Sequence, residues 1–171
     1  MNNTSHSSLI IRNADVEDVP LLLNFVKGIA EFEHLSHMVS ATEESLTKAF
    51  FGDRPYAEAL IAELDAEPVG FVVFFHNFST FVGKPGLYLE DLYVLPEHRE
   101  KGIGAALFKK CVQIARERDC GRMEWSALQW NPARKFYESF GAQLLDDWVI
   151  YRLDEKMISD LCSKIVCSKI V

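Results

Sequence analysis

The sequence lacks the cysteine and histidine patterns that mark a metal-binding or disulfide-stabilised protein. Its 171 residues include four cysteines and five histidines, and no cysteine stands in a Cys-x-x-Cys spacing or beside a group of histidines. Structural zinc sites need four such ligands at characteristic spacings, so we expect no metal cofactor. Cys111 lies on the apolar face of a predicted helix, where we expect it to pack.

Long hydrophobic runs and an excess of positive charge are absent as well. No apolar segment reaches the length of a membrane span and no basic, then apolar leader opens the chain, so we expect no membrane partner and a reducing, cytoplasmic setting. The 25 acidic residues outnumber the 18 Lys and Arg, for a net charge of -7, which disfavours a nucleic-acid partner. The acidity is compatible with a cationic small substrate, although many soluble proteins are mildly acidic.

One α/β domain is predicted over residues 8–155. A chain of 171 residues with 49% hydrophobic content can form one complete core, and no linker interrupts it. Residues 1–7 are polar and are expected to be loose. Residues 156–171 form a predicted C-terminal tail that contains Cys-Ser-Lys-Ile-Val twice, and we exclude the second copy from the fold prediction.

Hydrophobic spacing and turn residues predict the elements of this domain. Asp15, Thr42 and Asn131 are candidate helix caps. The helices are expected over 15–35, 42–51, 102–118 and 131–140. The strands are expected over 8–12, 57–64, 69–78, 87–95, 122–128 and 144–153. Two of these strands, 87–95 and 122–128, are joined through a helix and should form a right-handed parallel unit.

A glycine turn between the strand 87–95 and the helix after it is the most informative motif. Arg99-x-x-Gly102-x-Gly104 places bare backbone amides at the start of a helix, where unpaired N–H groups and a partial positive charge can hold a pyrophosphate. A side chain at either glycine would keep the backbone away from the phosphate oxygens. Arg99 could add a charged donor, and His98 could touch the phosphate. A surface turn without a ligand is the alternative.

The order of motifs resembles the GNAT superfamily of acyl-CoA-dependent N-acyltransferases. The glycine turn and, after a helix and a strand, Trp130-Asn131…Phe136-Tyr137…Gly141-Ala142 carry this resemblance, which spans about residues 8–155. The family implies a single domain with a mixed, mostly antiparallel sheet flanked by helices. It also implies that the central parallel strands splay apart around Leu92 and Ser126.

Three further segments look similar to the diamine (spermidine/spermine) and thialysine acetyltransferase group. They are Tyr88-Leu89-Glu90-Asp91, Asp147-Trp148 and Glu33. The chain departs from the polyamine enzymes over residues 79–84, which lack the acidic residue and the tryptophan that those enzymes carry. We therefore expect short amines to be preferred to spermine. The resemblance also implies a homodimer with the C-terminal strand near its interface.

Acetyl-CoA is the co-substrate that the resemblance implies. Its pantetheine arm would lie in the splay as a pseudo-strand, and its pyrophosphate would rest on the glycine turn. The residues implied in cofactor binding are Leu92, Tyr93, Val94, Arg99, Glu100, Lys101, Gly102, Ile103, Gly104, Ala105 and Asn131. Asn131 stands six residues before Tyr137, where the family usually has seven, which puts the Asn131 contact in question.

Two side chains are candidates for proton transfer. Acyl transfer to an amine requires that the amine lose a proton, and Glu90 stands at the strand position that the family uses for this step. Strand alternation would direct its neighbour Asp91 to the opposite face. Tyr137 is the candidate general acid for the leaving thiolate, because a phenol retains its proton at neutral pH. A structural carboxylate and a packed aromatic ring are the alternatives.

The acceptor site is predicted from charge and aromatic residues. Glu33 could bind a distal ammonium group, and Phe32 and Trp148 could line an alkyl-amine channel with Glu90 and Ser126. Core or interface packing is the alternative for the aromatic residues. The predicted function is transfer of an acetyl group to a primary amine of a small cationic molecule. A protein or peptide N-acetyltransferase and a non-catalytic acyl-CoA-binding module are the competing hypotheses.

Overall fold

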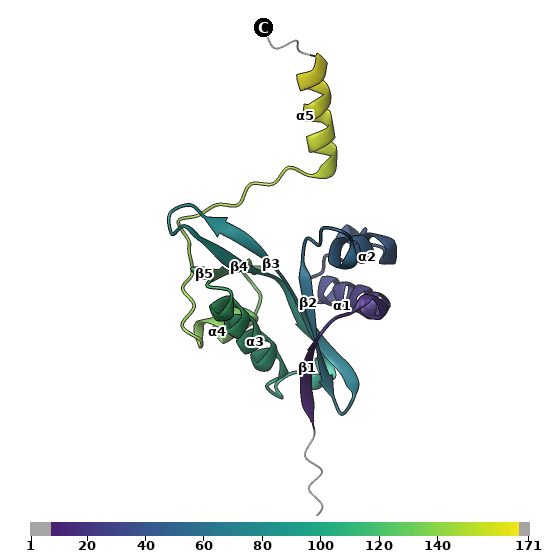
Figure 1. Cartoon of the computed structure of the whole chain (residues 1–171), viewed down its shortest axis with the longest axis vertical. Coiled ribbons are helices and arrows are strands. Elements are labelled where there is room, and N and C mark those ends of the chain that lie inside the picture. Colours follow the sequence, from purple (N-terminus) through teal and green to yellow (C-terminus); the bar gives the residue numbers. More distant parts are fainter. Residues whose placement is uncertain (1–7, 168–171) are drawn as a thin grey trace, which may run out of the picture. The chain divides into compact units, whose positions relative to one another are not determined.

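A five-stranded mixed sheet organises the larger part of the protein, as the computed structural model of residues 8–167 shows (Figure 1). The strands run in sequence order across the sheet: β1 (Leu9–Asn13), β2 (Glu58–Leu64), β3 (Glu67–Ser79), β4 (Lys84–Val94) and β5 (Arg122–Glu124). The first three pairs are antiparallel, and β4 and β5 are parallel. The predicted mixed, mostly antiparallel sheet with one parallel pair is therefore confirmed.

Helices cover both faces of this sheet. Helices α1 (Val19–Phe32) and α2 (Glu43–Phe51) lie on one face, and α3 (Ile103–Glu117) connects β4 to β5 across the other (Figure 1). Two of the three predicted caps are present: the Asp15 side chain accepts a hydrogen bond from Glu17 N–H before a 3₁₀ turn that leads into α1, and Thr42 caps α2. We name the two faces of the sheet the α1 face and the α3 face.

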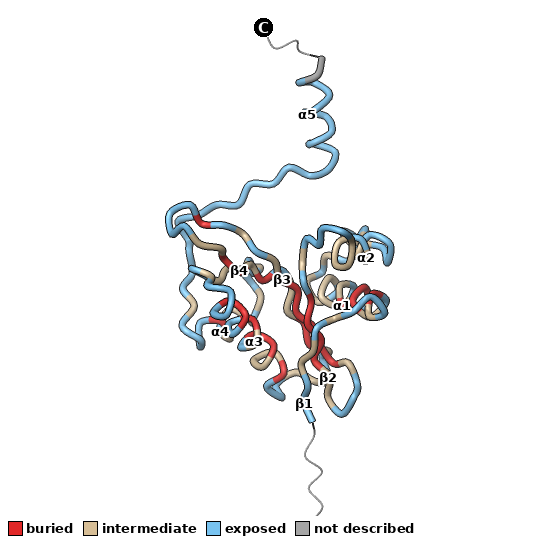
Figure 2. Tube along the Cα trace, in the orientation of Figure 1, coloured by how far each residue is buried: buried red, intermediate tan, exposed pale blue. Residues whose placement is uncertain are grey.

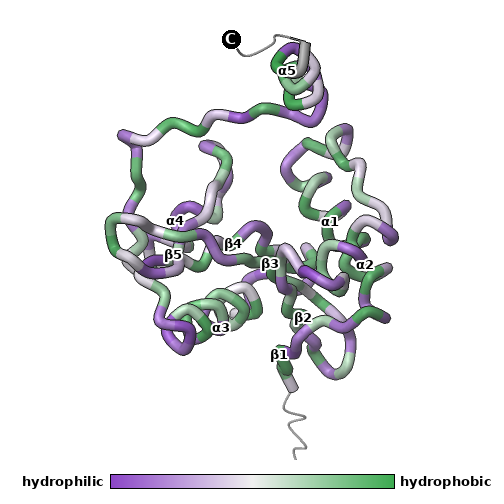
Figure 3. The backbone as a smooth tube through the Cα atoms, turned by 45° about the horizontal axis from the view of Figure 1, so that its top comes forward, coloured by the Kyte–Doolittle hydropathy of each residue, from purple (hydrophilic) through white to green (hydrophobic). Residues whose placement is uncertain are grey.

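The core lies between the sheet and its helices. Figure 2 shows buried segments along β2, β3 and β4 and on the inner sides of α1 and α3, and Figure 3 colours these two helices largely as hydrophobic. Phe71 contacts the α1 residues on one face, stacking on Phe25 with ring centroids 5.2 Å apart. Cys111 is fully buried as predicted, and burial raises the pKa of its thiol to about 12. It is therefore a packing residue.

The strand predictions after α3 are wrong in extent. β5 ends at Glu124 rather than at residue 128, because the chain diverges from β4 after the pair Tyr88 and Glu124. Residues 142–154 contain no helix or strand, although their alternating apolar pattern predicted strands over 144–153. A strand needs a neighbour to satisfy its backbone N–H and C=O groups, and no described residue pairs with this segment.

The chain divides into two compact units, and the second begins at Pro132. It contains α4 (Ala133–Glu138) and α5 (Glu155–Cys167). Pro132, not Asn131, occupies the cap position of α4, one residue later than predicted. Helix α5 occupies most of the predicted tail, and the side chain of Asp154 accepts a hydrogen bond from Met157 N–H at its start. The predictions for residues 1–7 and for 168–171 lie outside the described residues.

No helix among residues 8–167 is long and apolar enough to cross a membrane.

Candidate functional site

The outer edge of β4 is open over its second half. β5 pairs with β4 only through Gly86, Leu87 and Tyr88, whereas β3 pairs with β4 as far as Val94. The hydroxyl groups of Tyr88 and Ser126 are 2.9 Å apart just beyond the last parallel pair, where the two chains separate. This opening leaves the outer edge of β4 at Leu92, Tyr93 and Val94 without a partner strand among residues 8–167, which is the predicted splay. An extended ligand can pair with such an edge.

The glycine turn lies at the end of this open edge. The first hydrogen bond within α3 runs from Ala106 N–H to the Gly102 carbonyl at 3.0 Å, so the amides of Ile103, Gly104 and Ala105 have no partner within the helix. Gly102 has φ of 81°, a conformation that favours glycine. A side chain there would meet no atom within 4 Å. No acidic side chain stands in the first turn of α3, so the turn can accept an anion.

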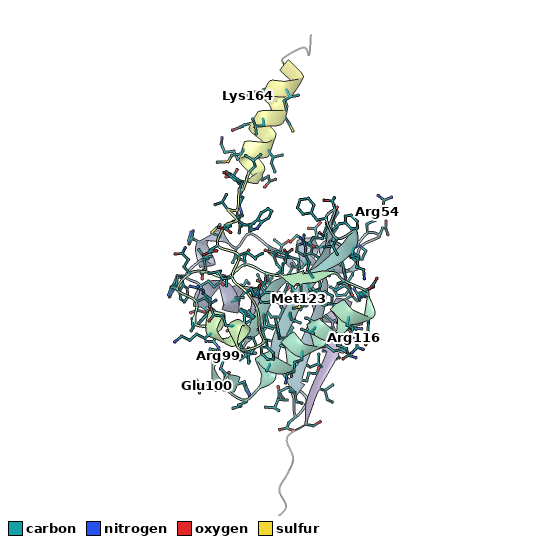
Figure 4. The ribbon with its side chains drawn as sticks, turned by 90° about the vertical axis from the view of Figure 1, so that its left-hand side faces the viewer. Arg54, Arg99, Glu100, Arg116, Met123 and Lys164 are labelled. Carbon is teal, nitrogen blue, oxygen red and sulfur yellow. The ribbon has the colours of Figure 1, made fainter. Side chains whose placement is uncertain are left out.

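Arg99 has contacts that the sequence did not predict. Its Nε donates a hydrogen bond of 3.0 Å to the Val94 carbonyl, and its guanidinium lies 4.6 Å from the Phe32 ring centroid and 5.5 Å from that of Tyr93. These contacts bind the glycine turn to β4 and to the end of α1. Figure 4 shows Arg99 and Glu100 together near one end of α3, with Arg116 at the other end. Arg99 therefore stabilises the turn that was expected to hold the pyrophosphate.

A β-bulge at Glu90 alters the predicted alternation of side chains. Val73 of β3 pairs with Asp91, and the next residue, Phe74, pairs with Leu89, so Glu90 is the extra residue of β4. Asp91 pairs with Val73, which belongs to the core cluster on the α1 face. The sequence-based argument that assigned Glu90 and Asp91 to opposite faces assumed a regular strand and does not hold across a bulge. Glu90 is exposed and Asp91 is partly buried.

Asp91 has the most strongly raised pKa among the carboxyl groups. Burial is the main cause, followed by the negative charges of Glu90 and Glu33, and together they raise the pKa to about 6. Burial also raises the pKa of Glu33, the C-cap residue that follows α1. We call Glu33, Glu90 and Asp91 the acidic cluster. A carboxyl group with a pKa near neutrality is suited to proton transfer, and the sequence analysis missed this role for Asp91.

Aromatic side chains lie beside the acidic cluster. The ring of Phe32 is 5.7 Å from that of Trp130, and His34 stacks on Trp130 at 5.7 Å with an interplanar angle of 27°. Phe32 directly precedes Glu33 of the acidic cluster in the sequence, and its role in substrate binding stays a prediction. The sequence analysis gave Trp130 no separate role, although it stands beside Asn131 in the motif that carried the family resemblance.

Three predicted residues belong to the later part of the chain. Asn131 N–H donates a hydrogen bond of 2.9 Å to the Leu128 carbonyl at the end of the first unit. Tyr137 lies on α4, is buried, and packs edge-to-face against Phe136 with ring centroids 5.1 Å apart. Trp148 is 74% exposed. Their predicted roles in cofactor binding, proton transfer and substrate binding stay predictions.

No group of three or more His, Cys, Asp or Glu side chains among the described residues is arranged to hold a metal ion.

Comparisons with known proteins point to one family. Residues 26–142 match the model of the acetyltransferase (GNAT) family. Thialysine N-epsilon-acetyltransferase from Bos taurus is 33% identical over 168 residues, which cover 91% of this chain and 98% of that protein. L-ornithine N5-acetyltransferase from Arabidopsis thaliana is 29% identical over 189 residues, which cover 84% and 83%. The structure of an integron cassette protein from the mobile metagenome of V. cholerae aligns with a TM-score of 0.76 at 26% identity, over 91% of this chain and 98% of that one.

Proposed function

Because the chain belongs to the acetyltransferase (GNAT) family, we propose that it transfers the acetyl group of acetyl-CoA to a primary amine of a small cationic molecule. The acidic cluster is the observation that carries this proposal. Three carboxylates next to the open edge of β4 favour a positively charged acceptor. The names of the thialysine and L-ornithine enzymes support a lysine-like acceptor, and a diamine or polyamine has the same reacting group.

The chain's own residues fit the acetyl donor. The open β4 edge at Leu92, Tyr93 and Val94 suits an extended pantetheine arm, and the unpaired amides at the start of α3 suit a pyrophosphate. When bound, acetyl-CoA would supply an activated thioester. A backbone N–H on the open edge could polarise its carbonyl oxygen. The β4 edge and the glycine turn are thus suited to the pantetheine arm and the pyrophosphate of acetyl-CoA, respectively.

We assign deprotonation of the acceptor's ammonium group to a carboxylate of the acidic cluster. A primary amine has a pKa of about 10 and arrives mostly protonated at neutral pH. A carboxylate can bind this ammonium group and then take its proton, directly or through a water molecule. Glu90 is the base that the sequence predicts, and the structure adds Asp91 with its raised pKa. The proton-accepting form of Asp91 accumulates as the pH rises through about 6.

Substitutions at these two positions test the proposal. If Asp91 is the base, Asp91→Asn lowers kcat by roughly 10²–10⁴-fold and removes the acidic limb of the pH–rate profile near pH 6. Glu90→Gln then retains activity, and its acidic limb moves to lower pH because the variant loses a charge that raises the pKa of Asp91. The measurement is release of free CoA thiol across a panel of amines between pH 5 and 9.

A stability measurement provides the control. The pKa of Asp91 is raised in the folded state, so its ionisation destabilises the fold as pH rises from about 4 to about 6. Asp91→Asn removes this cost and should increase stability at pH 7 by on the order of 1 kcal/mol. A slower variant that is at least as stable as the wild type supports a direct role. If only Glu90→Gln loses activity, Glu90 and not Asp91 is the base. If no amine in the panel leads to release of CoA thiol, the proposed function is contradicted.

We also propose that the protein is a cytoplasmic homodimer. Residues 144–153 and α5 carry exposed apolar side chains, including Val149 and Ile150, and such surfaces mark interaction sites. Light scattering at micromolar concentration should give particles of about 40 kDa, twice the chain mass of 19.5 kDa. Val149→Asp with Ile150→Asp should shift the protein to the monomer. Particles of about 20 kDa for the wild type would contradict the dimer.

A further inference from the structure

A second charged cluster lies on the α1 face, at the end of the sheet where β4 and β5 still pair. Arg122 and Glu124 of β5 form an ion pair, with Nε 2.9 Å from Oε2. Asn77 Nδ2, on β3, donates a hydrogen bond of 3.1 Å to the same Glu124 oxygen. The register places Asn77 beside Gly86 and Gly86 beside Arg122, so the three side chains meet across three strands. We call Asn77, Arg122 and Glu124 the head-group cluster.

Gly86 makes this arrangement possible. A Cβ atom at this position would lie 2.2 Å from Asn77 Oδ1 and 3.1 Å from Arg122 Cγ. The side chains of Asn77 and Arg122 therefore occupy the space that a side chain at position 86 would fill, and Asn77 can reach Glu124. The asparagine acts as a positioning residue that orients the carboxylate.

The charged groups of the cluster can accept a ligand. The side chains of Arg122 and Glu124 are 38% and 30% exposed. Among residues 8–167, the guanidinium of Arg122 pairs only with the Glu124 carboxylate, through Nε, so both of its terminal amino groups can donate to a ligand carboxylate. The cluster thus offers a cation and an anion side by side, which matches the two charges of an amino-acid head group.

Two aromatic rings, those of Phe75 and Tyr88, lie between the head-group cluster and the acidic cluster, and we call this pair the aromatic floor. Tyr88 pairs with Glu124 on one side and with Phe75 on the other, and its ring centroid is 5.0 Å from that of Phe75. The β3 residues Val73, Phe75 and Asn77 alternate onto the α1 face, the face on which Asp91 pairs with Val73. The two charged clusters therefore lie on one face, with an aromatic pair between them.

We propose that the head-group cluster binds the α-ammonium and α-carboxylate of an amino-acid acceptor, whose distal amine then lies at the acidic cluster. Arg122 binds the carboxylate, and Glu124 binds the α-ammonium group. This inference rests on the proposed function and selects, among small cationic amines, the amino acids with an amine at the end of the side chain. A diamine has no group for Arg122 and meets a repulsive charge there.

The spacing fits such an acceptor. Glu124 pairs with Tyr88, which stands three residues before Asp91, and the bulge takes one of these steps. The remaining two steps span about 7 Å along the strand and the step from β5 to β4 about 5 Å across it, for about 8 Å in all. A hydrogen bond of about 2.8 Å at either end of the ligand covers part of this distance. The extended side chain of lysine contains five bonds of about 1.5 Å between Cα and its amine, which reach about 6 Å. A lysine or a thioether analogue of the same length can therefore span the aromatic floor, whereas a much shorter amino acid cannot reach both clusters.

The matched acceptors L-lysine and cadaverine test this inference, because they differ only by the carboxylate. The wild-type protein should acetylate L-lysine with a higher kcat/KM. In Arg122→Gln, kcat/KM for L-lysine should fall roughly 10- to 100-fold, mainly through KM, because the lost contact lies away from the reacting amine. The value for cadaverine should stay within about twofold or rise. In Glu124→Gln both acceptors should lose affinity, because both carry a second ammonium group.

Controls separate the possible outcomes. Arg54→Gln makes the same charge change on the loop between α2 and β2 (Figure 4) and should alter neither acceptor. Retained cadaverine turnover shows that Arg122→Gln is folded. An equal loss for both acceptors in that variant, or no loss for either, would mean that the ion pair is only structural and would overturn the inference. If the wild type acetylates neither amine nor any other in the panel, the proposed function fails and this inference fails with it.

Discussion

Replacing Gly104 with valine should abolish binding of coenzyme A while the protein stays folded. A Cβ atom at Gly104 would lie 3.8 Å from Leu92 Cδ2 and from Val94 Cγ2, which is ordinary contact, so the fold has room for it. Helix propensity also favours valine over glycine, by a few tenths of a kcal/mol. The branched side chain would lie against Leu92 and Val94 of the open β4 edge, where we place the arm of coenzyme A on its way to the unpaired amides of the first turn.

Calorimetric titration with coenzyme A measures this effect. Ala106→Val is the matched control, because it adds a branched side chain to the same helix at a residue whose N–H is already bonded to the Gly102 carbonyl. Its affinity should match that of the wild type. Gly102→Glu should also eliminate binding, since it sets a negative charge at the turn. It forces a side chain into φ of 81° as well, at a cost of about 1–2 kcal/mol. Unchanged affinity in Gly104→Val would show that the turn holds no phosphate.

Tyr137→Phe should lower kcat by roughly 10²–10⁴-fold with little change in coenzyme A affinity. The variant retains the ring, so the edge-to-face packing against Phe136 is preserved and only the hydroxyl group is lost. A phenol keeps its proton at neutral pH and can protonate a departing thiolate, whereas phenylalanine cannot. The expected signature is a loss in turnover without a loss in binding.

Steady-state kinetics measures the effect on kcat, and calorimetry measures the effect on coenzyme A affinity separately. Phe136→Leu is a useful comparison, because it removes the aromatic neighbour but leaves the Tyr137 hydroxyl group in place. It should lower stability more than turnover. Turnover of Tyr137→Phe at the wild-type rate would show that the tyrosine only packs, and the proton for the thiolate would then have to come from another residue or from water.

Local sequence signals predicted the elements that depend on short-range physics. Asp15 caps the 3₁₀ turn that leads into α1, and Thr42 caps α2, because a side-chain oxygen next to a first turn satisfies free amides wherever the helix packs. The hairpin of β2 and β3 follows from a short turn between two apolar strands. The turn at Gly102 needs only a glycine and a following amphipathic helix. These features were correct because neighbouring residues decide them.

Features that depend on distant partners could not be predicted in the same way. An apolar alternating segment such as 144–153 becomes a strand only beside another strand, and among the described residues it has none. The true end of β5 depends on where β4 diverges from it. The role of Asp91 depends on a bulge, on burial, and on the charge of Glu33, which lies far away in the sequence.

The sequence by itself determined the order of elements, the glycine turn at the start of α3 and the family, because each rests on residue types at fixed short spacings. Only the tertiary structure decided which charged groups act together. It set Asp91 against Glu33 and raised its pKa, and it joined Asn77 to Glu124 over the bare backbone of Gly86. The physical reason is that desolvation and Coulomb forces depend on distance in space, and a strand register converts positions far apart in the chain into neighbours.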